Sequence, residues 1–474
     1  MDWNKLLCEK RRRSSSTSAV AAETRNEFQR DYHRIICSAS FRRLQDKTQV
    51  FPLDRGDFVR TRLTHSLEVA SFAKSLGQMI FRIIMEKEMD KDITPDRIVK
   101  ICSILECSGL IHDIGNPPFG HFGEDLIRDW FRKNLPHMEF DSKKITDILS
   151  EQMAADLYNF EGNAQALRLL TKLHFLVDEN GMNLTYPLLN TIIKYPVSSL
   201  EINCKSSDIR QKKMGYYQAD REIFEDITSS TGTFDHRHPL AFILEAADDI
   251  AYKTADTEDA VKKGFISYTV LLDELRNNYA TNCPTDAEKA TILTAAEKLE
   301  KFHAYAVANK VASPEQNAVQ RWIIYVQGIL LNCAVNAFVN NYSAIMDGAF
   351  KKELLAVSDA NTLAFALSDM ADRYVFRSQE IYKLEIAAEA IYEFLLGRLT
   401  RAAVLYDTDL PRSPIDMRIM ELVSDNYIRA YATCSAGRSD AEKLYLRLLL
   451  VTDFICGMTD GYAKKLYREL NGID

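Results

Sequence analysis

The sequence predicts an all-α protein. Apolar residues recur at three- and four-residue spacing through most of the 474 residues, whereas the alternation typical of strands is scarce. The composition, 46% hydrophobic and 27% charged, is that of a folded globular protein with enough apolar surface for a large core. Length alone leaves the number of domains open, because helical proteins of this size can share one core between two parts.

The helices can be placed from the apolar spacing and from the residues that break it. The residues after Arg62 (LTHSLEVASFAKSLGQMIFRIIMEKE) predict a long amphipathic helix, and residues 97–112 predict a nearly continuous apolar one. The second helix ends at residues 113–118, a cluster of glycine and proline that predicts a turn. Further helices are expected at residues 123–133, 163–176, 239–253, 286–306, 318–342, 384–395 and 441–470.

Four segments interrupt the helical pattern. Residues 8–18 (CEKRRRSSSTS) are basic and rich in serine, so we expect a mobile arm or one that a partner orders. An Asn-Gly pair between Asp178 and Tyr186 predicts a small β-hairpin. Residues 200–216 and 229–238 are rich in polar and turn residues, and we expect insertions or lid loops that order with substrate.

Charge, cysteine usage and hydropathy exclude several classes of protein. The net charge of −8 disfavours a non-specific DNA coat, so a nucleotide site must be a local basic pocket or a bound cation. Nine cysteines without a CxxC pair are typical of reduced thiols. The N-terminus has no apolar leader, and no uninterrupted run of about 18 apolar residues occurs. We therefore expect a cytoplasmic protein without a membrane partner.

Two histidines and two aspartates are the candidate metal ligands. His112 and Asp113 adjoin where a buried helix gives way to a turn, so both side chains can converge on one ion. His65 lies on the preceding helix, and Asp248 lies on a later, apolar helix where an unpaired carboxylate is costly. Two imidazoles and two carboxylates suit Mn²⁺, Fe²⁺, Zn²⁺ or Mg²⁺. The structural alternatives are a satisfied core histidine at His65 and a surface pair between Asp248 and a lysine such as Lys253.

Six stretches in one order along the chain carry the most specific pattern. They are FRRLQ (41–45), KTQVF (47–51), RTRLTHS (60–66), GLIHDIGNPPFGH (109–121), FEGNAQ (160–165) and GMTD (457–460). They resemble the bacterial deoxyguanosine triphosphate triphosphohydrolases (dGTPases), a family of the HD-domain phosphohydrolase superfamily. The resemblance runs from about residue 30 to residue 467, with poorer matching at residues 135–158, 200–216 and 277–316.

The resemblance implies a reaction and a domain order. Water attacks the α-phosphorus of a deoxynucleoside triphosphate, preferentially dGTP, and releases the deoxynucleoside and tripolyphosphate. The cofactor is a divalent metal, Mn²⁺ or Mg²⁺, with Fe²⁺, Zn²⁺ or Ni²⁺ as occupants in a purified sample. Residues 1–29 form an N-terminal arm, residues 30–265 the HD-domain catalytic core, and residues 266–474 a helical region that completes the nucleotide pocket and the oligomer contacts.

Residue roles follow from the same resemblance. The four candidate ligands named above match the metal ligands of the family, and His121 with Glu124 matches its proposed catalytic pair. Glu124 follows His121 by three residues at the start of a helix, so it can orient the imidazole while His121 serves the attacking water or the departing 5′-oxygen. The structural alternative for His121 is a turn histidine.

Substrate contacts are expected at four further positions. Arg62 can place a guanidinium on the phosphates, with a surface salt bridge as the alternative. Gln49, Tyr252 and Asp256 match positions that recognise deoxyribose, where a tyrosine ring beneath C2′ leaves no room for a ribose hydroxyl. Core packing is the alternative for Tyr252.

The base contacts rest on a looser alignment, in which Glu385 and Arg447 match guanine-contacting positions. Asp249 and Asn116 stand where related animal enzymes carry a lysine and a histidine that contact phosphate, so those contacts do not transfer fully.

The resemblance also implies partners. Relatives are commonly hexamers or other homo-oligomers, and some bind single-stranded DNA or a second nucleotide as an activator. The apolar stretch 322–338 suits subunit packing and core packing equally well. The alternative functions are another HD-type enzyme, either a nucleoside 5′-monophosphatase or a guanosine tetraphosphate hydrolase, and a non-catalytic nucleotide or DNA sensor.

Overall fold

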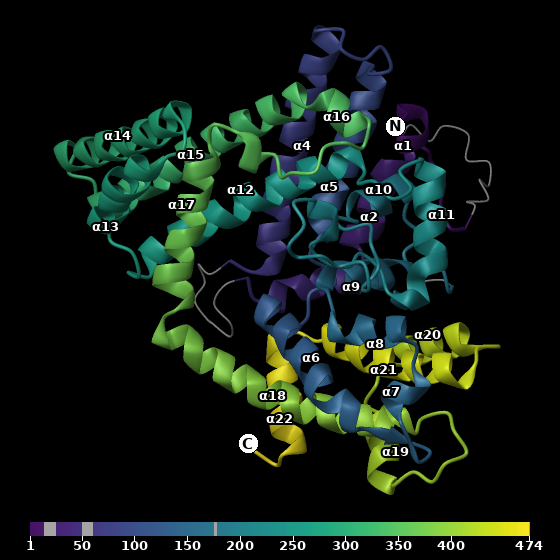
Figure 1. The fold of residues 1–474 in the computed structure, drawn as a ribbon. Helices are drawn as coiled ribbons and strands as arrows, with labels where there is room; N and C mark the ends of the chain where they lie inside the picture. Colours follow the sequence, from purple (N-terminus) through teal and green to yellow (C-terminus); the bar gives the residue numbers. More distant parts are fainter. Residues whose placement is uncertain (14–24, 50–59, 175–177, 474) are drawn as a thin grey trace. The chain divides into compact units, whose positions relative to one another are not determined.

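The computed structural model describes residues 1–13, 25–49, 60–174 and 178–473, and helices dominate it (Figure 1). Strands β1 (Glu139–Phe140) and β2 (Lys143–Lys144) pair antiparallel in a two-stranded sheet. The predicted all-α fold class is confirmed.

The chain divides into two compact units, each made of separate stretches. Unit 1 comprises Met1–Ser66, Leu110–Ala241 and Leu384–Asp474, and unit 2 comprises Leu67–Gly109 and Phe242–Lys383. In each unit, helices distant along the chain share one core. The expected order of N-terminal arm, catalytic core and helical C-terminal region stays a prediction.

Unit 1 holds most of the helices. They are α1 (Trp3–Leu6), α2 (Glu27–Ile36), α3 (Ala39–Arg42), α6 (Gly120–Asn134), α7 (Ile145–Ile148), α8 (Glu151–Tyr158), α9 (Gly162–Arg168), α10 (Tyr186–Thr191), α11 (Arg221–Thr231), α19 (Pro414–Met420), α20 (Asp425–Ser435), α21 (Asp440–Cys456) and α22 (Asp460–Leu470). Its short turns include the π-helical η3 (Leu169–Leu173) and the 3-10 turns η1 (Arg43–Asp46), η2 (Leu135–His137), η4 (Ile209–Gln211) and η5 (Gln218–Asp220).

Unit 2 is entirely helical in its regular structure. It contains α13 (Tyr268–Asp273), α14 (Asp286–Ala308), α15 (Pro314–Asn340), α16 (Tyr342–Met346) and α17 (Asn361–Ala371), with the turns η6 (Glu274–Tyr279), η7 (Ala280–Asn282), η8 (Leu355–Val357) and η9 (Asp372–Phe376). Helices α4 (Arg62–Glu86), α5 (Pro95–Ile111), α12 (Pro239–Lys262) and α18 (Gln379–Val404) have residues in both units.

A buried ion-pair network ties two distant helices of unit 1 together. The Arg168 guanidinium on α9 donates to both carboxylate oxygens of Asp453 on α21, at 2.8 Å from Nε and from Nη2. Its Nη1 also lies 3.4 Å from Asp220, and all three side chains are at most 2% exposed. Gln165, one turn earlier on α9, donates to the same Asp453 at 2.9 Å. These bonds fix α9 against α21.

In unit 2, α14 and α15 lie side by side (Figure 1). Trp322 of α15 is fully buried, and its indole donates to the Ala295 carbonyl at 2.8 Å. By length and composition alone α15 could cross a membrane, but half of its most apolar stretch is buried, and core helices pass the same test. No other helix in the described part of the chain qualifies. One such helix is weak evidence for a membrane span.

The expected helices are present, with corrections at two of them. The segment expected at 163–176 forms α9 and then the π turn η3, which ends at Leu173. The single helix expected at 441–470 is wrong, because α21 ends at Cys456 and α22 begins at Asp460. A side chain at Gly457 would collide with the Tyr427 hydroxyl, and the Thr459 hydroxyl accepts from the Tyr462 amide at 3.2 Å and caps the new helix.

The hairpin expected between Asp178 and Tyr186 is also wrong, since the two short strands are β1 and β2. The Asp178 carboxylate instead accepts from the Asn180 amide at 3.0 Å and forms a local turn. Thr185 makes an isolated bridge with Arg11, so the N-terminal segment takes the pairing that a second strand would need.

The expected mobile arm needs correction over residues 8–13; residues 14–18 lie outside the described residues. Trp3 just before it is 1% exposed, and Arg11 is 6% exposed. The Arg11 guanidinium pairs with the fully buried Asp31 at 2.5 Å. Arg11 is therefore the buried partner of a carboxylate, whereas Lys10 pairs with Asp226 near the surface and Arg12 is exposed.

Candidate metal centre and catalytic pair

Three of the four expected metal ligands meet in unit 1. His65 lies near the start of α4, and His112 and Asp113 follow α5 directly. Each residue offers one ligand atom, and these atoms lie within 4.8 Å of one another. The two histidines are 1% and 3% exposed, and their ring centroids are 5.3 Å apart. Two imidazole nitrogens and one carboxylate oxygen this close together suit a divalent cation.

The fourth expected ligand, Asp248, lies on α12 in unit 2. Lys253, which was its alternative partner, pairs with the neighbouring Asp249 at 3.1 Å. Burial raises the pKa of Asp249 to about 6, although Lys253 opposes the shift. Ligation by Asp248 stays a prediction.

The turn after α5 is held through the Asp113 carboxylate. The Asn116 amide donates to Oδ1 of Asp113 at 2.8 Å. The Arg62 guanidinium pairs with Oδ2, and Arg62 is 2% exposed. Arg62 is thus in a salt bridge, as its alternative role expected, but its side chain lies inside the protein and not at the surface. Its phosphate contact stays a prediction.

Lys47 and Asp460, two residues of the motifs that the sequence singled out, make hydrogen bonds to the backbone of residues 116–119 after α5. Lys47 is 3% exposed, and its ammonium donates at 2.6 Å to the carbonyls of Asn116 and Cys456. Burial lowers the pKa of Lys47 to about 8. Asp460 accepts from the Phe119 amide at 3.1 Å and binds Thr48. The sequence singled out both motifs but gave these side chains no role.

His121 and Glu124 form a pair at the start of α6. His121 Nδ1 lies 3.5 Å from Glu124 Oε2. The His121 side chain is 73% exposed, whereas that of Glu124 is 2% exposed. The hydrogen bond with Glu124 raises the pKa of His121. The structure thus brings an accessible imidazole onto a buried carboxylate, as the pattern predicts.

Glu124 has a second anchor at the start of α9. The Gly162 amide donates to Glu124 Oε1 at 3.1 Å. A Cβ atom at Gly162 would lie 2.5 Å from that oxygen and closer still to the Asn116 side-chain oxygen. Only glycine leaves room for both side chains here.

The expected deoxyribose contacts are divided between the units. Gln49 lies in unit 1, with its side-chain oxygen buried and without a hydrogen bond among the described residues. Tyr252 and Asp256 lie one turn apart on α12 in unit 2. Burial and the Asp256 carboxylate raise the pKa of Tyr252, so these two residues interact on one helix face. Their roles stay predictions.

Arg447 and Glu385, the expected guanine contacts, both lie in unit 1. Arg447 is 3% exposed, donates to the Tyr406 carbonyl at 3.0 Å and lies 5.0 Å over the Phe140 ring. These packing contacts account for its burial. Glu385 on α18 is partly exposed, and burial raises its pKa.

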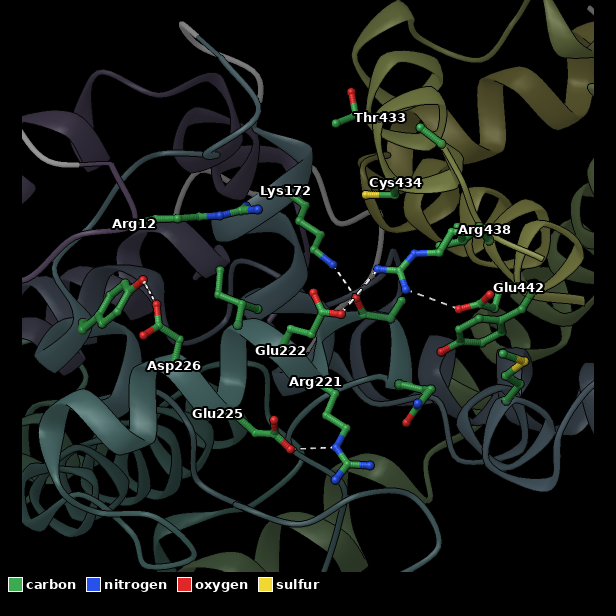
Figure 2. A pocket seen from close by; sticks show the side chains of 18 residues that line it. Arg12, Lys172, Arg221, Glu222, Glu225, Asp226, Thr433, Cys434, Arg438 and Glu442 are labelled. Carbon is green, nitrogen blue, oxygen red and sulfur yellow. Dashed lines mark hydrogen bonds and ion pairs between the residues drawn. The ribbon is translucent and has the colours of Figure 1, made fainter. Parts of the chain in front are cut away.

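A separate cavity of about 560 Å³ opens in unit 1 between η3, α11 and the α20–α21 region (Figure 2). Its charged lining consists of Arg12, Lys172, Arg221, Arg438, Glu222, Glu225, Asp226 and Glu442. The cations have partners: Arg221 lies 2.7 Å from Glu225, and Arg438 lies 3.4 Å from Glu442. Four cations offset by four carboxylates leave no net positive field for a triphosphate. None of the expected site residues lines this cavity.

Comparisons with known proteins agree with this site. Residues 62–185, which span the His65 and His112–Asp113 positions, match the family model described as HD domain. The chain is 47% identical, over all of both chains, to a deoxyguanosinetriphosphate triphosphohydrolase-like protein of Listeria monocytogenes serovar 1/2a.

More distant relatives cover the chain equally well. It is 32% identical to a protein of the same name from Pseudomonas aeruginosa (strain LESB58), over 100% of this chain and 99% of that one. It is 33% identical to the deoxyguanosinetriphosphate triphosphohydrolase of Enterobacter sp. (strain 638), over 99% of each. With such identity across whole chains and an HD domain around the histidine cluster, the chain belongs to the deoxyguanosinetriphosphate triphosphohydrolase family of the HD-domain superfamily.

Proposed function

We propose that this protein is a metal-dependent hydrolase of deoxynucleoside triphosphates, preferentially dGTP. Water adds to the α-phosphorus, the bond from that phosphorus to the 5′-oxygen breaks, and tripolyphosphate and the deoxynucleoside leave. The observation that carries the proposal is the buried cluster of His65, His112 and Asp113 in a chain of this family. A divalent cation bound there would polarise a phosphate oxygen and lower the pKa of water.

Asp248 is proposed as the fourth ligand. Mn²⁺ and Mg²⁺ are the proposed metals, because imidazole and carboxylate ligands accept both.

His121 is the proposed catalytic acid. Its Nδ1 faces Glu124, which assigns the Nδ1 proton to that hydrogen bond and leaves Nε2 for the substrate. The raised pKa of His121 favours the imidazolium, which can give a proton to the departing 5′-oxygen. Glu124 then stabilises the imidazole through the same bond.

Selectivity for the deoxy sugar is proposed to come from Gln49, Tyr252 and Asp256, with the tyrosine ring excluding a 2′-hydroxyl. Arg62 is the proposed phosphate contact. Glu385 and Arg447 are the proposed guanine contacts, although packing contacts already explain the burial of Arg447.

The family resemblance also supports a cytoplasmic homo-oligomer, a hexamer in its commonest form among relatives, with single-stranded DNA or a nucleotide as activator. Light scattering measures the oligomeric state, and the rate of dGTP cleavage with and without an oligonucleotide or a second nucleotide measures activation.

The test is a product-resolved screen of the four dNTPs and four NTPs with Mg²⁺ and with Mn²⁺. Tripolyphosphate plus deoxyguanosine from dGTP, with ribonucleotides rejected, is the expected outcome. Orthophosphate or pyrophosphate as the first product favours another HD-type enzyme. If Asp113→Ala and His121→Ala leave all activity unchanged while nucleotide still binds, the sensor function replaces the proposal.

A further inference from the structure

Lys213 lies between two buried carboxylates beside the His121–Glu124 pair. Its ammonium is 3.0 Å from Glu161 Oε2 and 3.9 Å from Glu124 Oε2. Both glutamate side chains are 2% exposed. Glu161 directly precedes α9, and its other charged neighbour is Arg128, at 3.7 Å. Two carboxylates thus share one buried space. Lys213 lies within 4 Å of both, and Arg128, which pairs with Glu161, also acts on the charge of Glu124.

The electrostatics of this group depend on charge compensation. Burial and the charge of Glu124 raise the pKa of Glu161. Burial also opposes ionisation of Glu124, but His121, Lys213 and Arg128 together hold its pKa below the ordinary value. The two carboxylates raise the pKa of Lys213 despite its burial. Without the ammonium, the pKa values of both acids would rise.

The backbone of Lys213 is fixed, although it lies in the segment 200–216 that the sequence predicted as a lid. Next to it, Met214 is fully buried, and the Gly215 amide donates to the Val197 carbonyl at 3.0 Å. The Gln211 carbonyl accepts from the Asn203 amide at 2.8 Å. The ammonium is therefore presented by an ordered turn.

We propose that Lys213 is a positioning residue for the catalytic pair: its charge compensates Glu161, so that Glu124 stays ionised and hydrogen-bonded to His121. The inference rests on the proposed function only in taking His121 and Glu124 as that pair. Lys213 itself need not touch the substrate.

The expected size of the effect follows from the distances. An opposite charge within about 4–6 Å lowers the pKa of a carboxyl by roughly 1–3 units. The Lys213 side chain is 36% exposed, so water screens it and the lower end applies. Removing the charge should raise the pKa values of Glu124 and His121 by about one unit.

The test compares four variants in pH profiles of kcat and KM: Lys213→Met, Lys213→Arg, Glu161→Gln, and Lys213→Met with Glu161→Gln. Lys213→Met should move the acidic limb of the pH profile of kcat to higher pH by about one unit. At pH values below that limb, kcat should therefore fall about tenfold. Lys213→Arg keeps the charge and should keep the limb. The double variant removes one anion with the cation, so its limb should return toward the wild-type position.

A second readout does not need turnover. In protein labelled with ¹³C at histidine Cε1, the His121 resonance, assigned from its loss in His121→Gln, should titrate about one unit higher in Lys213→Met and return in the double variant. If the wild type cleaves no deoxynucleoside triphosphate, the proposed function fails, and this titration still decides the role of Lys213.

Two outcomes would overturn the inference. In the first, KM rises equally in Lys213→Met and in the double variant, while the acidic limb of kcat and the pKa of His121 do not move. Lys213 would then be a phosphate contact. A uniform loss of kcat at every pH, with a lower melting temperature and an unmoved titration, would make its role structural only.

Discussion

Replacing Gly162 by alanine should separate the catalytic pair without unfolding the protein. The new Cβ would lie 2.5 Å from Glu124 Oε1 and closer to the Asn116 side-chain oxygen. Both are ends of flexible side chains, so they can rotate away while the backbone stays in place. The cost is the bond from the Gly162 amide to Glu124, and with it the orientation of His121. Rotation of Asn116 would also cost its bond to Asp113.

The magnitude follows from the lost bond. A hydrogen bond to a charged group contributes about 1.5–3 kcal/mol. If the orientation of His121 is needed in the transition state, kcat should fall roughly 10- to 150-fold. The free energy of unfolding should fall by only about 0–2 kcal/mol, because alanine favours the helix over glycine by up to about 1 kcal/mol and offsets part of the loss.

The assay measures kcat for dGTP cleavage together with the melting temperature. Gly461→Ala is the matched control, because Gly461 lies in the first turn of α22 and a Cβ there meets nothing within 4 Å. That variant should keep wild-type kcat. The reasoning is refuted if Gly162→Ala also keeps wild-type kcat, or if Gly461→Ala loses as much.

Three further predictions concern metal, stability and pH. His112→Ala should lose the divalent metal that copurifies with the protein, measured by inductively coupled plasma mass spectrometry, while the exposed His33→Ala retains it; equal metal content in both would contradict the cluster. Arg168→Met leaves the buried Asp453 without its cation, whereas Asp220 keeps Lys172 at 2.8 Å, and it should lower the free energy of unfolding by about 3–5 kcal/mol. Arg82→Met on the surface should change the urea midpoint little. Burial lowers the pKa of His238 to about 4. Between pH 4 and pH 6.5 the unfolded state therefore binds a proton that the folded state does not bind. The contribution of neutral His238 to the free energy of unfolding, on the order of 3 kcal/mol, is complete above about pH 6.5 and is lost as the pH falls toward 4. In His238→Gln the urea midpoint should depend less on pH across that window. If its dependence on pH is the same as in the wild type, groups other than His238 cause it.

The sequence predicted the parts of the molecule that depend on local pattern. The long apolar periodicities gave α4, α5 and α15, and the breaker cluster after His112 placed the turn that carries Asp113. The spacing of His121 and Glu124 on one helix was sufficient to predict their pairing. These features need no information about distant contacts.

The remaining features depend on contacts between distant segments. The last helical segment is divided at residues 457–459, where Tyr427 approaches Gly457 so closely that a side chain would not fit, and no periodicity signals this contact. The charges of Arg11 looked solvated because its buried partner Asp31 follows it by 20 residues. Lys213 had no signal at all, because its two carboxylates lie on segments separated from it by about 50 residues or more.

The most direct test of the proposed chemistry is the fate of labelled oxygen when the wild-type protein hydrolyses dGTP in ¹⁸O-enriched water with Mn²⁺. Phosphorus NMR should find tripolyphosphate with ¹⁸O on the terminal phosphate that was the α-phosphate, beside unlabelled deoxyguanosine. Label in orthophosphate or pyrophosphate, with a deoxyguanosine phosphate as the other product, would contradict attack at the α-phosphorus.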